Sequence, residues 1–290
     1  MCFRRPLKFS RTENSVGLRF AVRYGYGLMR FQTERFGVPL FGWRCPGALI
    51  GAMMALVLSS CSPDELYQLS DPTPSSYPIH GIDVSYYQGN IDWPRVRANG
   101  TTFAYIKATE GGDVADQRFD ENWEGARAAG LQRGAYHFYY FCRPVEQQIA
   151  WFEAHVPVDP DALPPALDME WNPQSKTCRI HPPREKILAD MQRFLDELER
   201  HYGKRPVIYS SIDFHRDVLE GAFDAYPFWL RSVKSFPAKR YGDRRWHFWQ
   251  YVEKGSLPGI SGFVDKNAFA GTHADWAKFC EGELDPRAWP

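Results

Sequence analysis

The sequence has no excess of charge of either sign, with 35 Lys+Arg against 35 Asp+Glu among 290 residues. Proteins dedicated to binding nucleic acid usually carry a clear basic excess, so no nucleic-acid partner is expected. Charged residues make up 24% and hydrophobic residues 44%, which excludes a disordered acidic tail and a coiled-coil rod. The chain has only 6 cysteines, and none is spaced as CxxC or grouped with histidine. The composition therefore indicates a globular protein without structural zinc.

The overall neutrality conceals an uneven distribution of charge. Subtracting the nine basic and two acidic residues of 1–60 from the totals of 35 leaves 26 basic and 33 acidic residues in 61–290, a net charge of about −7. Residues 47–58 form a 12-residue apolar run, shorter than the roughly 20 residues of a membrane-spanning helix. Such a run behind Arg35 and Arg44 is typical of a secretory signal.

The apolar run ends in Leu58-Ser59-Ser60-Cys61, which resembles a bacterial lipobox, whose Cys is lipidated and becomes the new N-terminus. We predict a leader over 1–60, in which 1–28 precede an alternative start at Met29, and a lipidated Cys61 followed by a Pro/Ser-rich tether over 61–79. The residues after Cys61 favour an outer-membrane anchor and a place in the cell envelope. An uncleaved N-terminal anchor and a secreted protein are the alternatives.

Three cysteines remain in the body of the protein: Cys142, Cys178 and Cys280. In an oxidising compartment one disulfide is expected among them. Cys142 and Cys178 would follow consecutive strands and are therefore the favoured pair. Three unpaired, partly buried thiols are the competing interpretation.

Short strand patterns alternate with helical patterns from residue 80 onward. Helices are predicted from Asp92, as N-cap, to Gly100 and over 119–129, 145–155 and 184–202, the last on the 4-3-4 spacing of its apolar residues. The strands are predicted at 81–84, 103–108, 134–138, 166–169, 207–210, 228–231, 247–251 and 262–265. Eight strands in this order indicate an α/β fold of one domain, a closed parallel β/α barrel that becomes irregular after residue 209.

Carboxylates collect at the predicted strand ends, where such barrels place their active sites. Asp83 ends the first strand, Asp168 and Glu170 end the fourth, and Asp265 ends the eighth. The i, i+2 spacing of Asp168 and Glu170 puts both on one face, with Cα atoms roughly 6.5–7 Å apart. Paired carboxyls can divide the acid and base work of glycoside hydrolysis. A surface Asp-x-Glu, or one paired with arginine, is the alternative that spacing alone leaves open.

Aromatic side chains accompany these carboxylates and could stack on sugar rings. Core packing explains about half of them in a chain with 16% aromatic residues. The candidates for substrate contact are Tyr87, Tyr136, Phe138, Tyr140, Trp171, Tyr209 and Trp249.

Several ordered blocks resemble glycoside hydrolase family 25, the lysozymes of the Chalaropsis and Cellosyl type. The blocks are GIDVS at 81–85 with YQG at 87–89 and IDW at 91–93, FAYIKATEG at 103–111, GAYHF at 134–138, LDME at 167–170, WQY at 249–251 and GISGFVDKN at 259–267. The resemblance covers about 80–272, the predicted catalytic barrel, and leaves 273–290 as a C-terminal extension.

The resemblance implies a flattened, irregular barrel and N-acetylmuramidase activity on peptidoglycan, without a cofactor or metal. The protein is expected to be a monomer. By carry-over, Glu170 is the general acid and Asp168 assists at the anomeric side, while Asp83 and Asp265 shape the pocket. Glu110 and Gln250 are weaker candidates. Phe228-Trp229-Leu230-Arg231-Ser232 departs from the family pattern, so Arg231 could contact substrate acids or pair with a pocket carboxylate. A chitinase-like glycosidase and a non-catalytic cell-wall-binding protein are the alternative functions.

Overall fold

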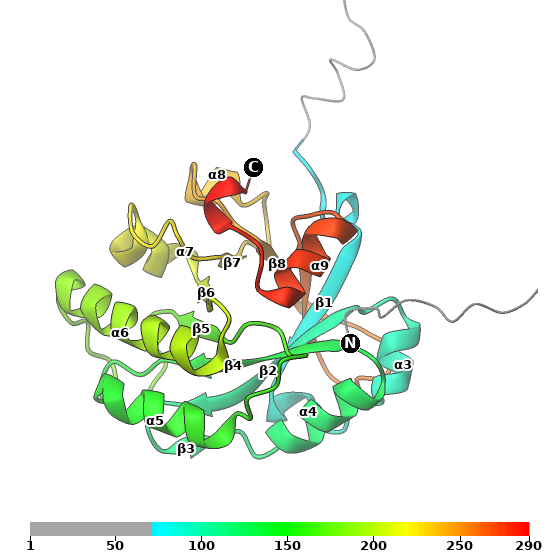
Figure 1. The fold of residues 1–290 in the computed structure, drawn as a ribbon, viewed down its shortest axis with the longest axis horizontal. Helices are drawn as coiled ribbons and strands as arrows, with labels where there is room; N and C mark the ends of the chain where they lie inside the picture. The colour runs from blue at the N-terminus through cyan, green and yellow to red at the C-terminus, as the bar shows by residue number, and fades with distance from the viewer. Residues whose placement is uncertain (1–70, 290) are drawn as a thin grey trace, which may run out of the picture. The chain divides into compact units, whose positions relative to one another are not determined.

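The computed structural model describes residues 71–289, and its strands form one sheet that closes on itself (Figure 1). Within these residues the strands are β1 (Ile79–Val84), β2 (Phe103–Glu110), β3 (Val114–Ala115), β4 (Gln132–Phe138), β5 (Ala166–Met169), β6 (Val207–Ser210), β7 (Phe228–Arg231), β8 (Phe248–Gly255) and β9 (Val264–Phe269). The barrel runs β1-β2-β4-β5-β6-β7-β8-β9 and closes because β1 pairs with both β2 and β9. The short β3 adds a hairpin to the end of β2. The closed barrel predicted from the sequence is confirmed.

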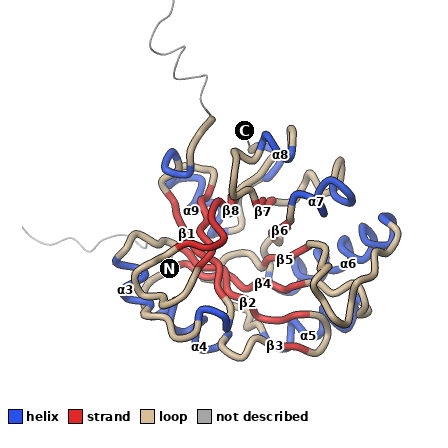
Figure 2. The backbone as a smooth tube through the Cα atoms, turned by 180° about the vertical axis from the view of Figure 1, so that it is seen from behind, coloured by secondary structure: helices blue, strands red, loops and turns tan. Residues whose placement is uncertain are grey.

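Helices cover the outside of the barrel, most fully beside β2, β4 and β5 (Figures 1 and 2). In α6, Ile187, Met191, Phe194 and Leu198 are buried, so the 4-3-4 spacing marks the face that packs on the barrel. The helices are α3 (Trp93–Ala98), α4 (Phe119–Ala128), α5 (Val145–His155), α6 (Arg184–Tyr202), α7 (Ile212–Phe214), α8 (Ala238–Tyr241) and α9 (His273–Glu281), with a π-helical turn η3 (His215–Leu219) and 3-10 turns η1 (Pro74–Ser76), η2 (Tyr86–Gln88) and η4 (Pro286–Ala288).

The last strand corrects the prediction of an all-parallel barrel. β9 is antiparallel to both of its neighbours, β1 and β8. The chain reaches it from β8 by a short return loop, and antiparallel strands need no crossover helix. β9 also starts at Val264, so Asp265 lies near the beginning of the strand and not at its end. Because β9 runs backwards, its beginning lies at the barrel edge where the parallel strands end.

Large aromatic side chains fill the interior of the barrel. Phe103 and Tyr105 project inward from β2, and Tyr105 stacks on Trp229 of β7 with ring centroids 5.0 Å apart. Gly134 leaves room for Tyr105, since a Cβ at that position would lie 2.4 Å from the tyrosine ring. The inward positions repeat every second residue along each strand, so the next inward residue of β2 is Lys107. The aromatic layer therefore supports a polar layer above it.

Both ends of the described chain pack against the barrel, which extends the domain beyond the predicted limits of 80–272. Tyr77 lies edge-on to Trp246 with ring centroids 5.8 Å apart, although residues up to 79 were assigned to the tether. In α9, Trp276 and Phe279 are buried in the inner core, and Trp289 joins them. Residues 273–289 therefore belong to the folded domain, because their aromatic side chains cover one end of the barrel.

Cys142 and Cys178 form a disulfide with a Cα–Cα separation of 5.7 Å. It joins the loop after β4 to the loop after β5 and so encloses the strand that carries Asp168. Cys280 is buried in the core. The predicted leader over 1–60, the lipobox ending at Cys61 and the tether up to residue 70 lie outside the described residues. Among residues 71–289, no helix combines the length and the apolar character needed to cross a membrane.

Candidate active site

A cleft of about 250 Å³ opens at the carboxyl ends of the parallel strands. Its lining includes all four carboxylates that the sequence placed at strand ends, together with tyrosines from several strands. The residues are Asp83, Val84, Ser85, Tyr87, Gln88, Lys107, Tyr136, Phe138, Asp168, Glu170, Tyr209, Trp229, Gln250 and Asp265. Of the predicted site, the structure thus brings together Asp83, Asp168, Glu170, Asp265, Tyr87, Tyr136, Phe138, Tyr209 and Gln250.

Strand β5 delivers two carboxyl groups to the same cleft. Asp168 lies on the strand and Glu170 directly follows it, while Met169 between them is fully buried on the opposite face. Asp168 is only 8% exposed, and its Oδ1 has no hydrogen-bond partner. An unpaired carboxylate oxygen in a buried position is costly, which is why it marks a place where an arriving ligand gains a hydrogen bond.

A hydrogen-bond network fixes the second pair of carboxylates. Asp83 and Asp265 lie opposite each other on β1 and β9. The Gln250 amide donates to Asp83 Oδ2 at 3.0 Å and to Asp265 Oδ2 at 3.2 Å, so one side chain bridges the two acids. The Asn267 amide donates to the same Asp83 oxygen at 2.7 Å.

Two aromatic side chains of the barrel interior hold the amides of Gln250 and Asn267 in place. The indole N–H of Trp229 donates to Asn267 Oδ1 at 2.7 Å, and the Tyr209 hydroxyl donates to Gln250 Oε1 at 3.0 Å. With their oxygens engaged in this way, both amides present N–H groups to the carboxylates. The orientation of Gln250 and Asn267 therefore follows from the packing of the barrel interior.

Burial raises the pKa values of all four carboxyl groups, and nearby negative charges raise them further for Asp168, Glu170 and Asp265. Burial raises the pKa of Glu170 to about 7, against the opposing charge of Arg231. Burial and then the charge of Asp83 raise the pKa of Asp265 to about 8. Burial raises the pKa of Asp83 itself to about 6 despite its two amide donors. For Asp168, burial and then the neighbouring Glu170 charge raise the pKa well above the ordinary range.

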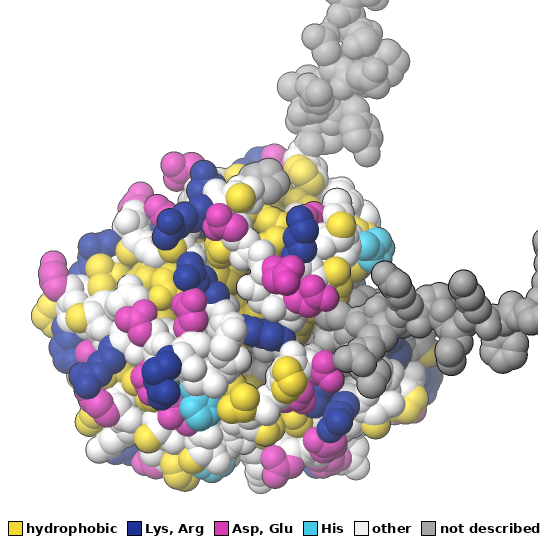
Figure 3. All heavy atoms as spheres, in the orientation of Figure 1, with side chains coloured by type: hydrophobic (Ala, Val, Ile, Leu, Met, Phe, Trp, Pro, Cys, Tyr) yellow, Lys and Arg dark blue, Asp and Glu magenta, His cyan; other side chains and the backbone are white. Residues whose placement is uncertain are grey.

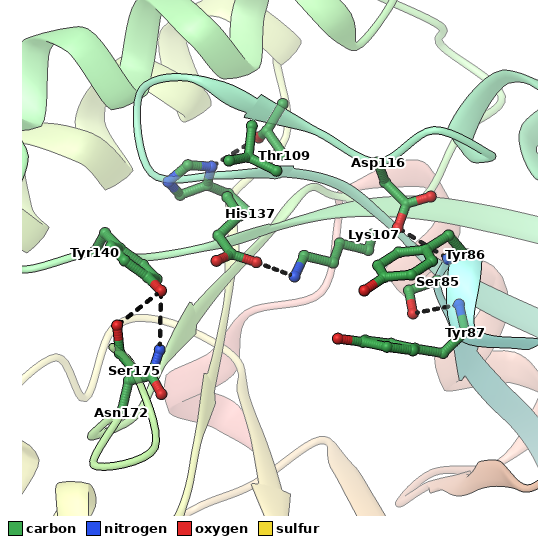
Figure 4. Close-up of polar contacts among 12 residues, drawn as sticks. Ser85, Tyr86, Tyr87, Lys107, Thr109, Asp116, His137, Tyr140, Asn172 and Ser175 are labelled. Carbon is green, nitrogen blue, oxygen red and sulfur yellow. Dashed lines mark hydrogen bonds and ion pairs between the residues drawn. The ribbon is translucent and has the colours of Figure 1, made fainter. Parts of the chain in front are cut away.

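Two basic side chains offset part of this negative charge. Lys107 Nζ donates to Glu110 Oε2 at 2.5 Å and lies 5.0 Å from the centroid of the Phe138 ring. Figure 4 shows the Lys107 ammonium directed away from the rings of Tyr86 and Tyr87. On the other side, Arg231 forms an ion pair with Glu253. Arg231 therefore pairs with a carboxylate outside the cleft lining.

Four predicted substrate contacts do not line the cleft. Glu110 forms an ion pair with Lys107. Tyr140 bonds Ser175 Oγ at 3.1 Å in the loop that holds the disulfide (Figure 4). Trp171 stacks on His181 with centroids 3.9 Å apart. The predicted substrate contact of Trp249 is corrected by the structure. Its side chain faces outward from the barrel, is 4% exposed and donates to the Ser232 carbonyl at 2.8 Å.

The prediction from sequence missed Lys107, Trp229 and Asn267. A signal for all three was present in the two-residue alternation of the strands. Lys107 lies two residues after inward Tyr105, and Asn267 lies two residues after Asp265. The same rule places Trp249 outward, since it precedes inward Gln250 by one residue.

The carboxyl groups of the site can divide acid and base roles between them. Among residues 71–289, no group of three His, Cys, Asp or Glu side chains is arranged to hold a metal ion. A carboxyl that keeps its proton near neutral pH, beside a second carboxyl with an unpaired oxygen, suits proton donation to a leaving group. Exposed Tyr87 at the mouth, in ring contact with Tyr86 at 4.1 Å, offers a flat surface for a sugar.

Comparison with known proteins agrees with this geometry. Residues 82–260 match the model of the glycosyl hydrolases family 25. The chain is 35% identical to lysozyme M1 of Streptomyces globisporus over 211 residues, which is 68% of this chain and 69% of that protein. It is 37% identical to the uncharacterized protein YegX of Escherichia coli K12 over 214 residues, 72% of this chain and 76% of that one.

Solved structures give the same result for the fold. A family 25 glycosyl hydrolase from Bacillus anthracis superposes with a TM-score of 0.65 at 34% identity, covering 70% of this chain and 94% of that one. The bacterial lysozyme of Streptomyces coelicolor gives a TM-score of 0.63 at 32% identity, covering 71% and 98%.

Replacing Asp168 with asparagine is expected to stabilise the fold, more at pH 8 than at pH 5. The unfolded carboxyl titrates near 4, and burial raises the folded pKa. Between the two values the folded state keeps a proton that the unfolded state has lost, so this group lowers stability as pH rises. Urea unfolding should show a gain of about 1–3 kcal/mol at pH 8.

The matched control for this measurement is Asp161→Asn, which makes the same chemical change at an exposed position. We expect that variant to unfold like the original chain at both pH values. A loss of stability in Asp168→Asn at pH 8 would show that the carboxylate is satisfied in the folded state.

Proposed function

The chain belongs to glycosyl hydrolase family 25, and from this premise we propose how its cleft cuts a glycan and how it is held in the cell envelope. It is a peptidoglycan hydrolase of the lysozyme type, which cleaves the β-1,4 bond between N-acetylmuramic acid and N-acetylglucosamine. The observation that carries the catalytic assignment is the placement of Asp168 and Glu170 by one strand in one cleft.

Glu170 acts as the general acid. Its raised pKa of about 7 keeps a large fraction of the carboxyl protonated at neutral pH. The proton passes to the glycosidic oxygen as the bond to the anomeric carbon breaks, and the leaving sugar departs as an alcohol. A water molecule then adds its oxygen to the anomeric carbon and gives one proton to the Glu170 carboxylate, which forms the new hydroxyl and restores the acid.

Asp168 assists on the anomeric side of the bond. Its unpaired Oδ1 is available to the N–H of the substrate's own acetamido group, which would orient that group toward the anomeric carbon. Asp83 and Asp265 act electrostatically: the charge of Asp83 opposes the loss of the Glu170 proton, and Asp265, with a pKa of about 8, mostly keeps its own proton at neutral pH. Lys107 limits this effect, since its positive charge also faces Asp168.

Binding of the glycan rests on the tyrosines of the cleft. Tyr87 is 75% exposed at the mouth, where its ring can stack on a sugar. Tyr136 and Tyr209 lie deeper, and burial keeps their pKa values well above 10, so both hydroxyls stay protonated. The net negative domain does not attract an anionic wall polymer by charge, so stacking and hydrogen bonds supply the recognition. The enzyme is expected to act as a monomer.

Substitution Glu170→Gln tests the assigned acid. It keeps the shape of the side chain but removes the transferable proton, so hydrolysis of purified peptidoglycan should fall at least about 100-fold. Products are separated by chromatography and identified by mass spectrometry, and the original chain should release muropeptides with muramic acid at the new reducing end.

The control is Glu185→Gln, an exposed carboxyl at the start of α6, which should leave both rate and thermal unfolding unchanged. Full activity in a folded Glu170→Gln variant would remove Glu170 from the mechanism. A parallel digest of chitin separates the alternative substrate: faster release from chitin than from peptidoglycan would assign the enzyme to that polymer.

We further place the enzyme on the membrane through a lipid on Cys61. Support comes from the sequence Leu58-Ser59-Ser60-Cys61 behind an apolar run, and from the nine residues, 62–70, that separate Cys61 from the start of the described domain. The tether gives the catalytic domain limited reach from a membrane, on the order of 35 Å if extended. The outer membrane and the periplasmic wall are the proposed location.

Substitution Cys61→Ser tests the anchor in a Gram-negative host. The original chain should fractionate with the outer membrane and take up radiolabelled palmitate, whereas the variant should take up none. Cys280→Ser, which removes a thiol in the folded domain, is the control and should still be labelled. Equal labelling of the Cys61→Ser variant would exclude lipid attachment at that residue.

A further inference from the structure

A second cavity, larger than the catalytic cleft, lies on the outside of the barrel. Its volume is about 510 Å³. Its wall comes from the connection between β6 and β7, including η3, and from the connection between β7 and β8, including α8. It shares no lining residue with the catalytic cleft.

The cavity exists because the barrel is irregular here. The connection between β7 and β8 contains only the four-residue α8 where a β/α barrel ordinarily has a long helix. The missing helix leaves Tyr226, Phe228 and Tyr241 as an aromatic wall. The space is therefore a consequence of the backbone and not of one mobile side chain.

A buried arginine forms the floor of this cavity. The Arg244 side chain is 5% exposed and lies 4.4 Å from the centroid of the Phe228 ring. Its Nε–H donates to His215 Nε2 at 3.0 Å and an Nη–H donates to the Leu219 carbonyl at 2.8 Å, while the other Nη pairs with Asp224. These bonds use three of its five N–H hydrogens, and the Arg244 side chain lines the cavity.

His215 adds a neutral donor next to the arginine. Arginine can only donate, so His215 Nε2 must accept, which leaves the ring hydrogen on Nδ1. Burial and then the Arg244 charge lower the pKa of His215 to about 4, so the ring stays neutral. The floor therefore places a guanidinium beside a neutral imidazole, and a guanidinium is suited to bind an anionic oxygen.

The rim of the cavity carries charges of both signs. Arg240 and Arg245 are exposed, and neither takes part in an ion pair among residues 71–289. Glu220 and Asp243 lie on the same rim. Figure 3 shows basic and acidic side chains side by side in the region of α7 and α8. A mixed rim of this kind favours a ligand that carries an anion and an ammonium group together over a simple polyanion.

The N-terminal segment of the domain meets the same part of the surface. Asp71 forms an ion pair with Lys239 of α8, one residue before Arg240. Tyr77 packs edge-on against Trp246, one residue after Arg245. The chain that leads back to Cys61 therefore leaves the domain beside the cavity, and Cys61 lies within about 35 Å of Asp71 along the chain.

From these observations we propose that the cavity binds the headgroup of a zwitterionic phospholipid, a phosphate with a primary ammonium. Arg244, Arg240 and Arg245 would hold the phosphate, and the rim carboxylates Glu220 and Asp243 would accept from the ammonium. The choice of a membrane ligand rests on the proposed lipid anchor, because the tether brings this face toward the lipid surface. Headgroup binding would dock the anchored domain and fix the direction in which its cleft opens.

Calorimetric titration of the full chain in detergent with glycerophosphoethanolamine tests the proposal. Saturable binding is expected, and the double variant Arg240→Gln, Arg245→Gln should weaken it at least about tenfold through the loss of charge-assisted hydrogen bonds. The control Arg95→Gln, Arg127→Gln removes the same charge from exposed positions on α3 and α4 and should bind like the original chain. Both double variants should keep full peptidoglycan hydrolysis, since none of the four substituted residues lines the cleft.

Two further titrations identify the source of the ligand. Inorganic phosphate should bind more weakly than glycerophosphoethanolamine, and equal affinity would reduce the cavity to a simple anion site. A muramyl stem peptide, which carries carboxylates and an amine, should not compete, and tighter binding of that peptide would make the cavity a wall-binding site instead. Absence of any binding overturns the proposal, whatever the outcome for Glu170 or Cys61, because the titration depends on neither hydrolysis nor lipid attachment.

Discussion

The structure of the site depends on the confinement of four carboxyl groups above the aromatic side chains that fill the barrel interior. Phe103, Tyr105 and Trp229 fill the barrel interior, so the inward residues of the next layer cannot retreat from the cleft. Holding several carboxyls in a partly dry space is unfavourable when all are ionised. The site reduces this cost in two ways: protons stay bound, and amide donors from Gln250 and Asn267 satisfy Asp83. The same confinement that costs stability provides an acid at neutral pH.

The reversed direction of β9 completes this arrangement. Because β9 is antiparallel to β1, the start of one strand meets the end of the other, and Asp265 lies directly opposite Asp83. The pairing also sets Gln250 opposite Asn267 across β8 and β9. The reversal of β9 therefore brings both Asp265 and Asn267 to the site. The strand register then sets them opposite Asp83 and Gln250. The short later connections have a second effect, since they expose the cavity beside α8 that a regular barrel would cover.

Much of this could be predicted from the sequence, and the failures have physical causes. The apolar spacing of 184–202 and the strand at 166–169 matched α6 and β5, because local pattern and burial agree there. The direction of β9 depends on pairing between residues nearly 200 positions apart, which no local pattern reports. Trp249 was predicted to stack on a sugar because of its residue type. The alternation of side chains along the strand instead places it in the hydrophobic core. The bridging role of Gln250 depends on side chains from three strands.

The most direct test of the account is the pH dependence of kcat/KM for peptidoglycan hydrolysis, measured beside Arg231→Gln. The acid must be protonated to act, so kcat/KM should fall as pH rises through an apparent pKa of about 7. Arg231 lowers the pKa of Glu170, so its neutral replacement should move the alkaline limb to higher pH. An alkaline limb with an apparent pKa near the ordinary glutamate value of about 4.3 would contradict a confined, protonated Glu170. So would an apparent pKa that is the same in Arg231→Gln as in the original chain.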